Sequence, residues 1–372
     1  MRTQVSVVKC DSYEPALVWQ AVKKSIDALG GISVFVKPAS KVLVKPNLLM
    51  AKEPEFGITT HPEVVRAVVR LLKEINCRIF IGDGPSVWGG QAQNLDAVYE
   101  KTGIKRICAE ENVELVKFDK RRWRGKFPLT SWLDNCDSLV SIPKFKTHEL
   151  TLLTAGIKNL YGLVSDSFKT ELHKEHFEPE DFSRVLVDIY EEVKPGLTVI
   201  DGIMGMEGDG PATSGKLREL GLIMAGRDCV ALDSIAALVM GIKPQDVLTN
   251  LEAARRGLGE MDLKNIQVIG ESLDDIVEES FMLPATSSKL KIPRPLINFV
   301  KQFIHFYPKI NHAHCSRCAA CIEVCPQKII SLKNGRIVID YPGCISCFCC
   351  QEACPSAAIK IKKSLLAKLL GL

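Results

Sequence analysis

Nine of the chain's 14 cysteines lie within its last 60 residues, in two runs that share one spacing. The runs read Cys315-x2-Cys318-x2-Cys321-x3-Cys325-Pro326 and Cys344-x2-Cys347-x2-Cys350-x3-Cys354-Pro355. Three thiolates at two-residue gaps can hold three irons of a 4Fe–4S cubane, and the Pro after the fourth cysteine turns the chain toward a neighbouring cubane. This pattern, the strongest in the sequence, indicates a protein that handles electrons.

The spacing is the ligand pattern of bacterial two-cluster ferredoxins, in which the fourth cysteine of each run ligates the other cluster. It predicts two 4Fe–4S clusters. One would be held by Cys315, Cys318, Cys321 and Cys354, and the other by Cys344, Cys347, Cys350 and Cys325. Structural zinc usually takes two separated C-x2-C pairs, and disulfides need an oxidising compartment, so both alternatives fit less well. Cys349 is interpreted as a small buried side chain beside a cluster.

A second group of reactive side chains lies in the stretch PKFKTHELTLLTAGIKNLYG, at 143–162. Its polar members are Lys144, Lys146, His148, Lys158 and Asn159, and they follow a predicted apolar strand. Such side chains can converge on a pocket, and gathered lysines favour an anionic substrate such as a carboxylate or phosphate. A solvated loop is the alternative. The glycines at 156 and 162 favour a site, because glycine allows the backbone to approach a ligand closely.

The glycine-rich segment GIMGMEGDGPATSG, at 202–215, is a third candidate. Such a loop can turn backbone N–H groups toward an anion, and Glu207, Gly208 and Asp209 are predicted to bind a cofactor there. The two carboxylates could also act as acid/base groups or ligate a hard cation, whereas a flexible acidic turn is the alternative. Neither G-x-G-x-x-G opening a helix nor G-K-[ST] occurs, so no dinucleotide or P-loop site is predicted.

Three further side chains are candidates. Asn47 follows a predicted strand, and His61 precedes a predicted helix; we expect both to contribute to cofactor binding, although the two threonines before His61 could serve only as helix caps. His173 lies three residues before His176, so on a helix the pair would share a face and could bind a metal. A merely polar helix face is the preferred interpretation of that pair.

Alternating strand and helix signals must position these residues. Apolar segments predict strands at 3–9, 41–44, 78–81, 137–142, 197–200, 221–225 and 266–269. Periodic segments predict helices at 14–29, 62–75 and 229–240. This alternation predicts an α/β fold with a mainly parallel sheet flanked by helices, and functional loops beyond the carboxyl ends of the strands.

The domain organisation follows from composition. Residues 1–284 are predicted to form the α/β domain, and 285–311 a linker that begins rich in Ser, Lys and Pro and could include a short amphipathic helix at 296–306. Residues 312–361, with an internal repeat offset by 29 residues, predict a small α+β ferredoxin-like domain. The tail 362–372 is predicted to be a basic amphipathic helix docked on its own protein, with a membrane surface or a partner as alternatives.

Charge and hydropathy limit the function classes. The net charge is +4, but residues 285–372 carry 13 Lys and Arg against 3 Asp and Glu. Part of this excess would offset the negative charge of thiolate-ligated clusters. No stacking aromatic residues accompany it, so nucleic acid is not a predicted partner. Neither a signal peptide nor a transmembrane segment is evident, and thiolate ligands need reducing conditions, so a cytoplasmic protein is expected.

Several segments together resemble the "domain of unknown function 362" family, which is often fused to a ferredoxin unit. The matching segments are VKPNL at 44–48, TTHPE at 59–63, IGD at 81–83, IPKFKTH at 142–148, GIKNLYG at 156–162, DGIMGMEGDGP at 201–211 and ALD at 231–233. The resemblance covers most of the first 280 or so residues. It implies the fold class and the iron–sulfur fusion, and it implies no particular reaction.

The order His148…Gly156-x-Lys158…His173 is also similar to that of the nickel-pincer lactate racemase family. In that family a lysine holds the pincer cofactor and a histidine ligates nickel. The resemblance implies that Lys158 could anchor a cofactor and that His173 could ligate a metal. The surrounding glycine pattern differs from that of the family.

The combined prediction is an iron–sulfur oxidoreductase that passes electrons from two 4Fe–4S clusters to an anionic substrate or cofactor in the α/β domain. Lys144, Lys146 and Lys158 would bind the anion with His148, which would also supply a proton, since histidine titrates near neutral pH. A redox partner protein is expected. The alternatives are an electron carrier that docks a partner enzyme, a metal-dependent isomerase or racemase, and a cluster-dependent regulator. No distinctive flavin motif is visible.

Overall fold

The computed structural model describes residues 2–85, 95–278, 280–287 and 305–364. A 10-stranded sheet forms the centre of the larger unit, with the order β12-β1-β11-β10-β7-β2-β3-β4 and with β8 and β9 branching from β10. Its strands are β1 (Thr3–Lys9), β2 (Lys41–Pro46), β3 (Arg78–Ile81), β4 (Glu114–Leu115), β7 (Ser138–Ile142), β8 (Lys144–His148), β9 (Leu152–Thr154), β10 (Leu197–Gly208), β11 (Gly215–Gly226) and β12 (Ile266–Gly270).

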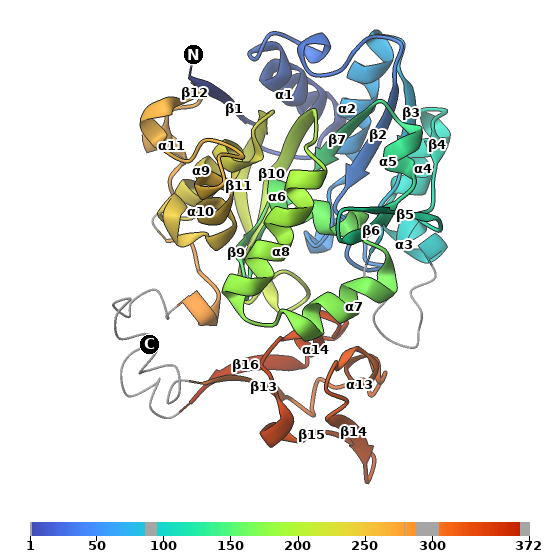
Figure 1. Cartoon of the computed structure of the whole chain (residues 1–372), viewed down its shortest axis with the longest axis vertical. Helices are drawn as coiled ribbons and strands as arrows, with labels where there is room; N and C mark the ends of the chain where they lie inside the picture. The colour runs from blue at the N-terminus through green and yellow to red at the C-terminus, as the bar shows by residue number, and fades with distance from the viewer. Residues whose placement is uncertain (1, 86–94, 279, 288–304, 365–372) are drawn as a thin grey trace.

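Helices cover both faces of this sheet (Figure 1). They are α1 (Pro15–Asp27), α2 (Pro62–Glu74), α3 (Leu95–Lys101), α4 (Ile104–Glu110), α5 (Trp132–Asn135), α6 (Gly156–Asn159), α7 (Asp166–Glu175), α8 (Pro179–Glu192), α9 (Cys229–Val239), α10 (Leu248–Arg255) and α11 (Leu273–Ile276). One apolar core joins the sheet to α1 and α2, and others join it to α8 and α9. The predicted α/β class is confirmed.

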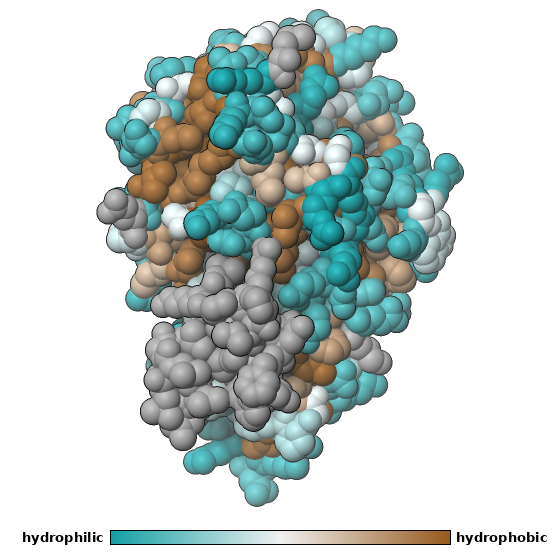
Figure 2. Space-filling view, turned by 60° about the vertical axis from the view of Figure 1, so that its left-hand side comes forward, coloured by the Kyte–Doolittle hydropathy of each residue, from teal (hydrophilic) through white to brown (hydrophobic). Residues whose placement is uncertain are grey.

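Short 3-10 turns and one hairpin complete the larger unit. The turns are Ile32–Val34, Pro54–Phe56, Leu160–Leu163, Pro244–Asp246 and Leu263–Asn265, and β5 (Arg121–Arg124) pairs with β6 (Phe127–Thr130). The surface of one face is mostly hydrophilic, with apolar residues gathered mainly in its upper left part (Figure 2). Among the described residues, no helix is both long and apolar enough to cross a membrane.

The sheet is mixed, although most of its pairs are parallel. β7, β2, β3 and β4 run parallel, and β10 runs parallel to β7 and β8. β11 is antiparallel to both β1 and β10. The strand predicted at 197–200 in fact continues to Gly208 and pairs with β11, so most of the segment predicted as a glycine-rich loop is strand. The prediction of a loop was wrong because glycines occur in bulged, closely packed hairpins as well as in loops.

The smaller unit is built around the two cysteine runs. β13 (Phe306–Ile310) is antiparallel to β16 (Ile359–Lys363), and β14 (Ile330–Lys333) pairs with β15 (Arg336–Ile339). Between them lie α13 (Ala320–Val324), the 3-10 turn Tyr341–Gly343 and α14 (Cys349–Glu352). β13 lies in the range predicted as linker, because the first strand pairs with the last. Two tail lysines belong to β16; the rest of the predicted tail helix, like residues 296–304, lies almost entirely outside the described residues.

The 29-residue repeat is also a repeat of backbone conformation. Non-glycine residues with positive φ occur at Arg317, Ala319 and Lys328. They recur 29 residues later at Ser346, Phe348 and Ala357, and each φ agrees with its counterpart within a few degrees. Side chains rarely adopt this conformation, so its recurrence shows that each run folds in the same tight path. The two runs therefore form equivalent halves of one unit.

The smaller unit lies below the sheet, with α14 beside α7 (Figure 1). Hydrogen bonds join it to the loop between β10 and β11. The Thr213 hydroxyl donates to the Cys354 carbonyl at 2.6 Å, and Gln351 Nε2 donates to the Asp209 carbonyl at 2.7 Å. Phe306 and Phe348 share an apolar core with α8. The second cysteine run is thus the half that faces the α/β unit.

Candidate functional site

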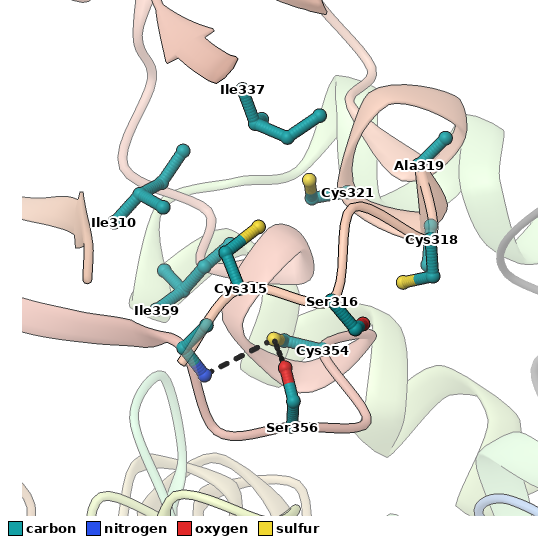
Figure 3. A pocket seen from close by; sticks show the side chains of 12 residues that line it. Ile310, Cys315, Ser316, Cys318, Ala319, Cys321, Ile337, Cys354, Ser356 and Ile359 are labelled. Atoms are coloured by element: carbon teal, nitrogen blue, oxygen red, sulfur yellow. Dashed lines mark hydrogen bonds between the residues drawn. The ribbon is translucent and has the colours of Figure 1, made fainter. Parts of the chain in front are cut away.

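The eight cysteines of the two runs surround two cavities. The first is lined by Cys315, Cys318, Cys321 and Cys354. Figure 3 shows their sulfur atoms around a space walled by isoleucines. The second is lined by Cys325, Cys344, Cys347 and Cys350. Each cavity therefore takes three cysteines from one run and the fourth from the other.

The donor set fits a multinuclear cluster better than a single ion. Among the described residues, no three Cys, His, Asp or Glu side chains stand close enough to hold one metal ion. Zinc needs four sulfurs about 2.3 Å from one point, whereas a cubane needs them spread around its own volume. Burial and the neighbouring Cys354, Cys318 and Cys315 raise the pKa of Cys321 to about 12. Positive iron would be needed to keep these sulfurs as thiolates.

β8 carries three polar side chains on alternate positions of a fully buried strand. Lys144 and Lys146 are each 1% exposed and His148 is fully buried, so the alternative of a solvated loop is wrong. Lys144 Nζ lies 2.9 Å from Asp201 and 2.5 Å from the Tyr13 hydroxyl. Lys144 is therefore committed to an internal ion pair.

The ammonium groups of Lys146 and Lys45 have other partners than the Lys144–Asp201 ion pair. Lys146 Nζ donates to Asn47 Oδ1 and to a backbone carbonyl, each at 2.7 Å, and burial together with Lys158 and Lys144 lowers its pKa well below the ordinary value. Lys45 Nζ lies 2.6 Å from Asp83 Oδ1, both nearly fully buried. Burial lowers the pKa of Lys45 although Asp83 opposes the shift.

Lys158 is carried by the short helix α6, which α9 holds in place. Asp233 on α9 accepts hydrogen bonds from the Gly156 and Ile157 backbone amides, at 2.6 and 3.0 Å. A Cβ at Gly156 would lie 3.0 Å from Asp233, so glycine allows this approach. Lys158 Nζ lies 5.8 Å from the ring centroids of Tyr161 and Phe182, and burial lowers its pKa.

The smaller unit adds one carboxylate to this group. Glu352, at the end of α14, is 6% exposed, and its Oε1 lies 3.2 Å from His148 Nε2. Although burial alone would raise the pKa of Glu352, the facing His148 and Lys158 lower it to about 2. Burial, followed by Lys158, lowers the pKa of His148 to about 4.

Most of these side chains line one cavity of about 60 Å³ between the two units, which we call the lysine cavity. Its polar lining comprises Lys45, Asn47, Asp83, Lys146, Thr154, Lys158, Asn159, Lys169, His173 and Glu352. This volume has room for a few water molecules or a small anion. The lysine cavity is thus a basic cavity. It is formed by strand ends together with α6, α7 and α14, which carries the predicted cluster ligand Cys350.

The structure separates some predicted site residues from the lysine cavity. His61 accepts from the Glu63 backbone amide at the start of α2 and stacks on Tyr13, with 3.7 Å between ring centroids. Glu207 accepts from the Met282 amide and Asp209 from the Ala285 amide. His61, Glu207, Gly208 and Asp209 lie outside the cavity lining, as do Lys144 and His148.

His173 and His176 also lie in different surroundings. His173 lines the lysine cavity and stacks on Phe182, with 4.4 Å between ring centroids. His176 lies beyond the end of α7 with non-helical dihedral angles. The two rings therefore do not share a helix face.

Sequence reasoning missed four contributors to the cavity: Lys45, Asp83, Lys169 and Glu352. Lys45 and Asp83 lie in the segments VKPNL and IGD, so adjacency to strand ends was a usable signal. Lys169 Nζ donates to the Gly84 carbonyl across the cavity wall. Glu352 lies between two cluster cysteines, where no local signal shows which half of the repeat is covered.

Comparisons with known proteins agree with this architecture. The family described as "Domain of unknown function (DUF362)" matches residues 42–238, and a 4Fe-4S dicluster domain matches residues 307–355. A "Thylakoid-associated protein" of Synechocystis sp. is 30% identical over 324 residues, which cover 82% of this chain and 99% of that protein. An "Uncharacterized ferredoxin" of Methanocaldococcus jannaschii is 41% identical over 39 residues, 10% of this chain and 26% of that protein.

A solved structure is similar at a low level. The lactate racemase apoprotein from Thermoanaerobacterium thermosaccharolyticum matches with a TM-score of 0.37 and 15% identity, over 61% of this chain and 54% of that chain. A likeness of this size carries no argument about shared chemistry. The roles that the racemase resemblance implied for Lys158 and His173 stay predictions.

Proposed function

Because the chain belongs to the DUF362 family and carries a 4Fe-4S dicluster domain, as its motifs predicted, we propose that it is an iron–sulfur oxidoreductase. Two 4Fe–4S clusters pass electrons to a small anionic substrate or cofactor in the lysine cavity. Cys315, Cys318, Cys321 and Cys354 hold one cluster, and Cys325, Cys344, Cys347 and Cys350 hold the other. The grouping of these cysteines around two cavities supports this ligand assignment.

One observation carries the proposal: Glu352 belongs both to the cluster-binding α14 and to the wall of the lysine cavity. It lies two residues from Cys350 and from Cys354, so a molecule in the cavity is within a short distance of the cluster ligands. Lys146 and Lys158 would bind the anion, and the low dielectric of the buried site strengthens that attraction. The position of Glu352 in both places supports an electron source next to an anion site.

Protons must accompany the electrons. Clusters held by the eight cysteines would supply electrons one at a time, and two electrons with two protons would convert the substrate to its reduced form. A low-potential one-electron carrier protein resupplies the clusters. A lysine ammonium in the cavity can supply one proton, and protonated His148 can pass the other through Glu352, which lies 3.2 Å from its Nε2 and lines the cavity. The cytoplasm is the expected compartment, because thiolate ligands need reducing conditions.

The test uses the whole chain, prepared without oxygen. We expect about eight irons per chain. After chemical reduction, small acids and redox cofactors are screened for reoxidation of the clusters by absorbance. His148→Ala and Lys158→Ala should slow reoxidation by a factor of about 100, whereas Lys9→Ala, a substitution of a surface lysine, should not. Reoxidation of both site variants at wild-type rates by every acceptor would remove the proposed site. Reoxidation by a partner protein alone would favour an electron carrier.

A further inference from the structure

We infer that the lysine cavity selects a small dianion, a phosphate monoester or a dicarboxylate, bound between Lys146 and Lys158. The inference rests on the proposed function, because it takes the cavity as the substrate site. It goes beyond that proposal by fixing the charge that the substrate must carry.

Lys45 cannot be one of the anion-binding groups. Its three N–H donors are directed at the Pro46 carbonyl at 3.0 Å, Asn159 Oδ1 at 3.2 Å and Asp83 Oδ1 at 2.6 Å. The Lys45–Asp83 pair is neutral overall and has no donor left for a ligand. It therefore forms part of the wall.

Lys146 and Lys158 differ from Lys45 because neither forms an ion pair. Within the described ranges, neither has a carboxylate within 4.0 Å, and Lys158 Nζ has no hydrogen-bond partner. Lys146 gives two hydrogen bonds to neutral oxygens and has a third N–H uncommitted. Burial lowers the pKa of both; Lys158 and Lys144 lower that of Lys146 further, whereas Glu352 opposes the shift of Lys158. Two ammonium groups without an ion pair on the wall of one cavity make a site for two negative charges.

Glu352 sets an upper limit on that charge. Its carboxylate, paired with His148, lies in the same wall. A third anionic group on the ligand would face this carboxylate, so polyphosphates are disfavoured. Among the described residues, the apolar lining consists of Leu48, Leu49, Tyr161 and Pro211. A small, doubly charged acid fits both limits.

Calorimetric titration of the oxidised holoprotein tests this inference without turnover. The probes are phosphate, malonate, acetate and pyrophosphate. We expect phosphate or malonate to bind at one site per chain, and acetate and pyrophosphate to bind at least about 30-fold more weakly. Phosphate alone would identify the phosphate-ester class, and malonate alone the dicarboxylate class. Equal binding of acetate, or tighter binding of pyrophosphate, would overturn the inference.

Variants assign the binding to the two lysines. Lys158→Met should weaken dianion binding by about 30-fold or more, Lys158→Arg should retain most of it, and Lys9→Met should leave it unchanged. Unaltered binding by Lys158→Met would overturn the inference.

The outcomes separate the two proposals. Dianion binding without any reoxidation of reduced clusters would leave the charge inference standing and remove the oxidoreductase function. Alternatively, uncharged or singly charged acceptors could reoxidise the clusters in a way that depends on Lys158, with no dianion binding. That result would support the oxidoreductase function and overturn the charge inference.

Discussion

Glu323 and Glu352 occupy the same position in the two cysteine runs, yet their surroundings differ. Glu323 is exposed, whereas Glu352 is buried against His148. The backbone around them repeats, so docking against the α/β unit, and not local sequence, makes the difference. The different surroundings of Glu323 and Glu352 therefore depend on which half of the repeat the α/β unit covers.

This pair gives a matched test. Glu352→Gln should slow substrate-driven reoxidation of reduced clusters by roughly 10- to 100-fold, because it removes the charge that holds His148 while keeping the side chain's shape. Glu323→Gln should leave the rate unchanged. Stopped-flow absorbance measures both rates, and the visible spectrum shows that each variant keeps its clusters. Equal rates in the two variants would mean that Glu352 has no part in electron delivery.

The lysines of β8 show what could not be predicted from sequence at this scale. Lys144 and Lys146 were recognised as candidates, but their burial in a strand was not. Alternation in KFKTH places both lysines and His148 on one side of the strand, and a polar side is ordinarily a solvated one. Here Asp201 pairs with Lys144, and oxygens of Asn47 and a carbonyl satisfy Lys146. Partners on distant strands cannot be recognised from the sequence around the lysines.

At the scale of elements, the contact between α6 and α9 decides where Lys158 lies. Asp233 fixes α6 through two backbone amides, and burial raises the pKa of its carboxyl to about 7. The protonated form is favoured in the folded state, so folding binds a proton between about pH 3.8 and 7. The contribution of Asp233 to stability therefore falls as pH rises through that window.

Asp233→Asn removes this dependence. The difference in free energy of unfolding between wild type and Asp233→Asn should shrink as pH rises from 5.5 to 7, by up to about 1.4 kcal/mol per pH unit, and should be constant above about pH 7.5. Denaturant unfolding under anaerobic conditions measures it. Loss of one amide hydrogen bond should also cost the variant about 1–3 kcal/mol. A difference that is flat from pH 5.5 to 8 would contradict the pKa shift.

The junction between β10 and β11 is a second element with a testable role. Gln351 is fully buried and donates to the Asp209 carbonyl at 2.7 Å. Gln351→Ala should leave that carbonyl without its donor and loosen the contact between the units by about 1–3 kcal/mol. Hydrogen exchange at residues 209–214 should rise, with the cluster spectrum unchanged. Exchange at wild-type rates would show that this bond does not hold the units together.

For the whole molecule, the crossed grouping of cysteines makes a distinct prediction. Cys325 lies in the first run but lines the cavity of the second. Cys325→Ser should therefore damage the same cluster as Cys350→Ser, and a different one from Cys321→Ser, with about four irons lost in each. Electron paramagnetic resonance of the reduced variants measures this. Matching spectra for Cys325→Ser and Cys321→Ser would contradict the crossed arrangement.

At this scale, much of the fold followed from sequence. Short apolar runs bounded by turn residues gave β1 and β3 their observed limits, and the helices were correct within a few residues. The mixed character of the sheet was harder to predict from the sequence. The direction of β11 depends on its hairpin with β10, and the glycines of that hairpin favoured the prediction of a loop. The lysine cavity could not be predicted, because it joins α14 to strands about 200 residues earlier.

The two equivalent halves of the smaller unit have one more consequence. Among the described residues, Gln351 and Cys354 of the second half are hydrogen-bonded to the α/β unit, whereas the equivalent Glu323 of the first half is exposed. A symmetrical pair of cubanes would on its own carry charge equally well either way. With one end covered, external electron donors would reach the pair through the exposed first half.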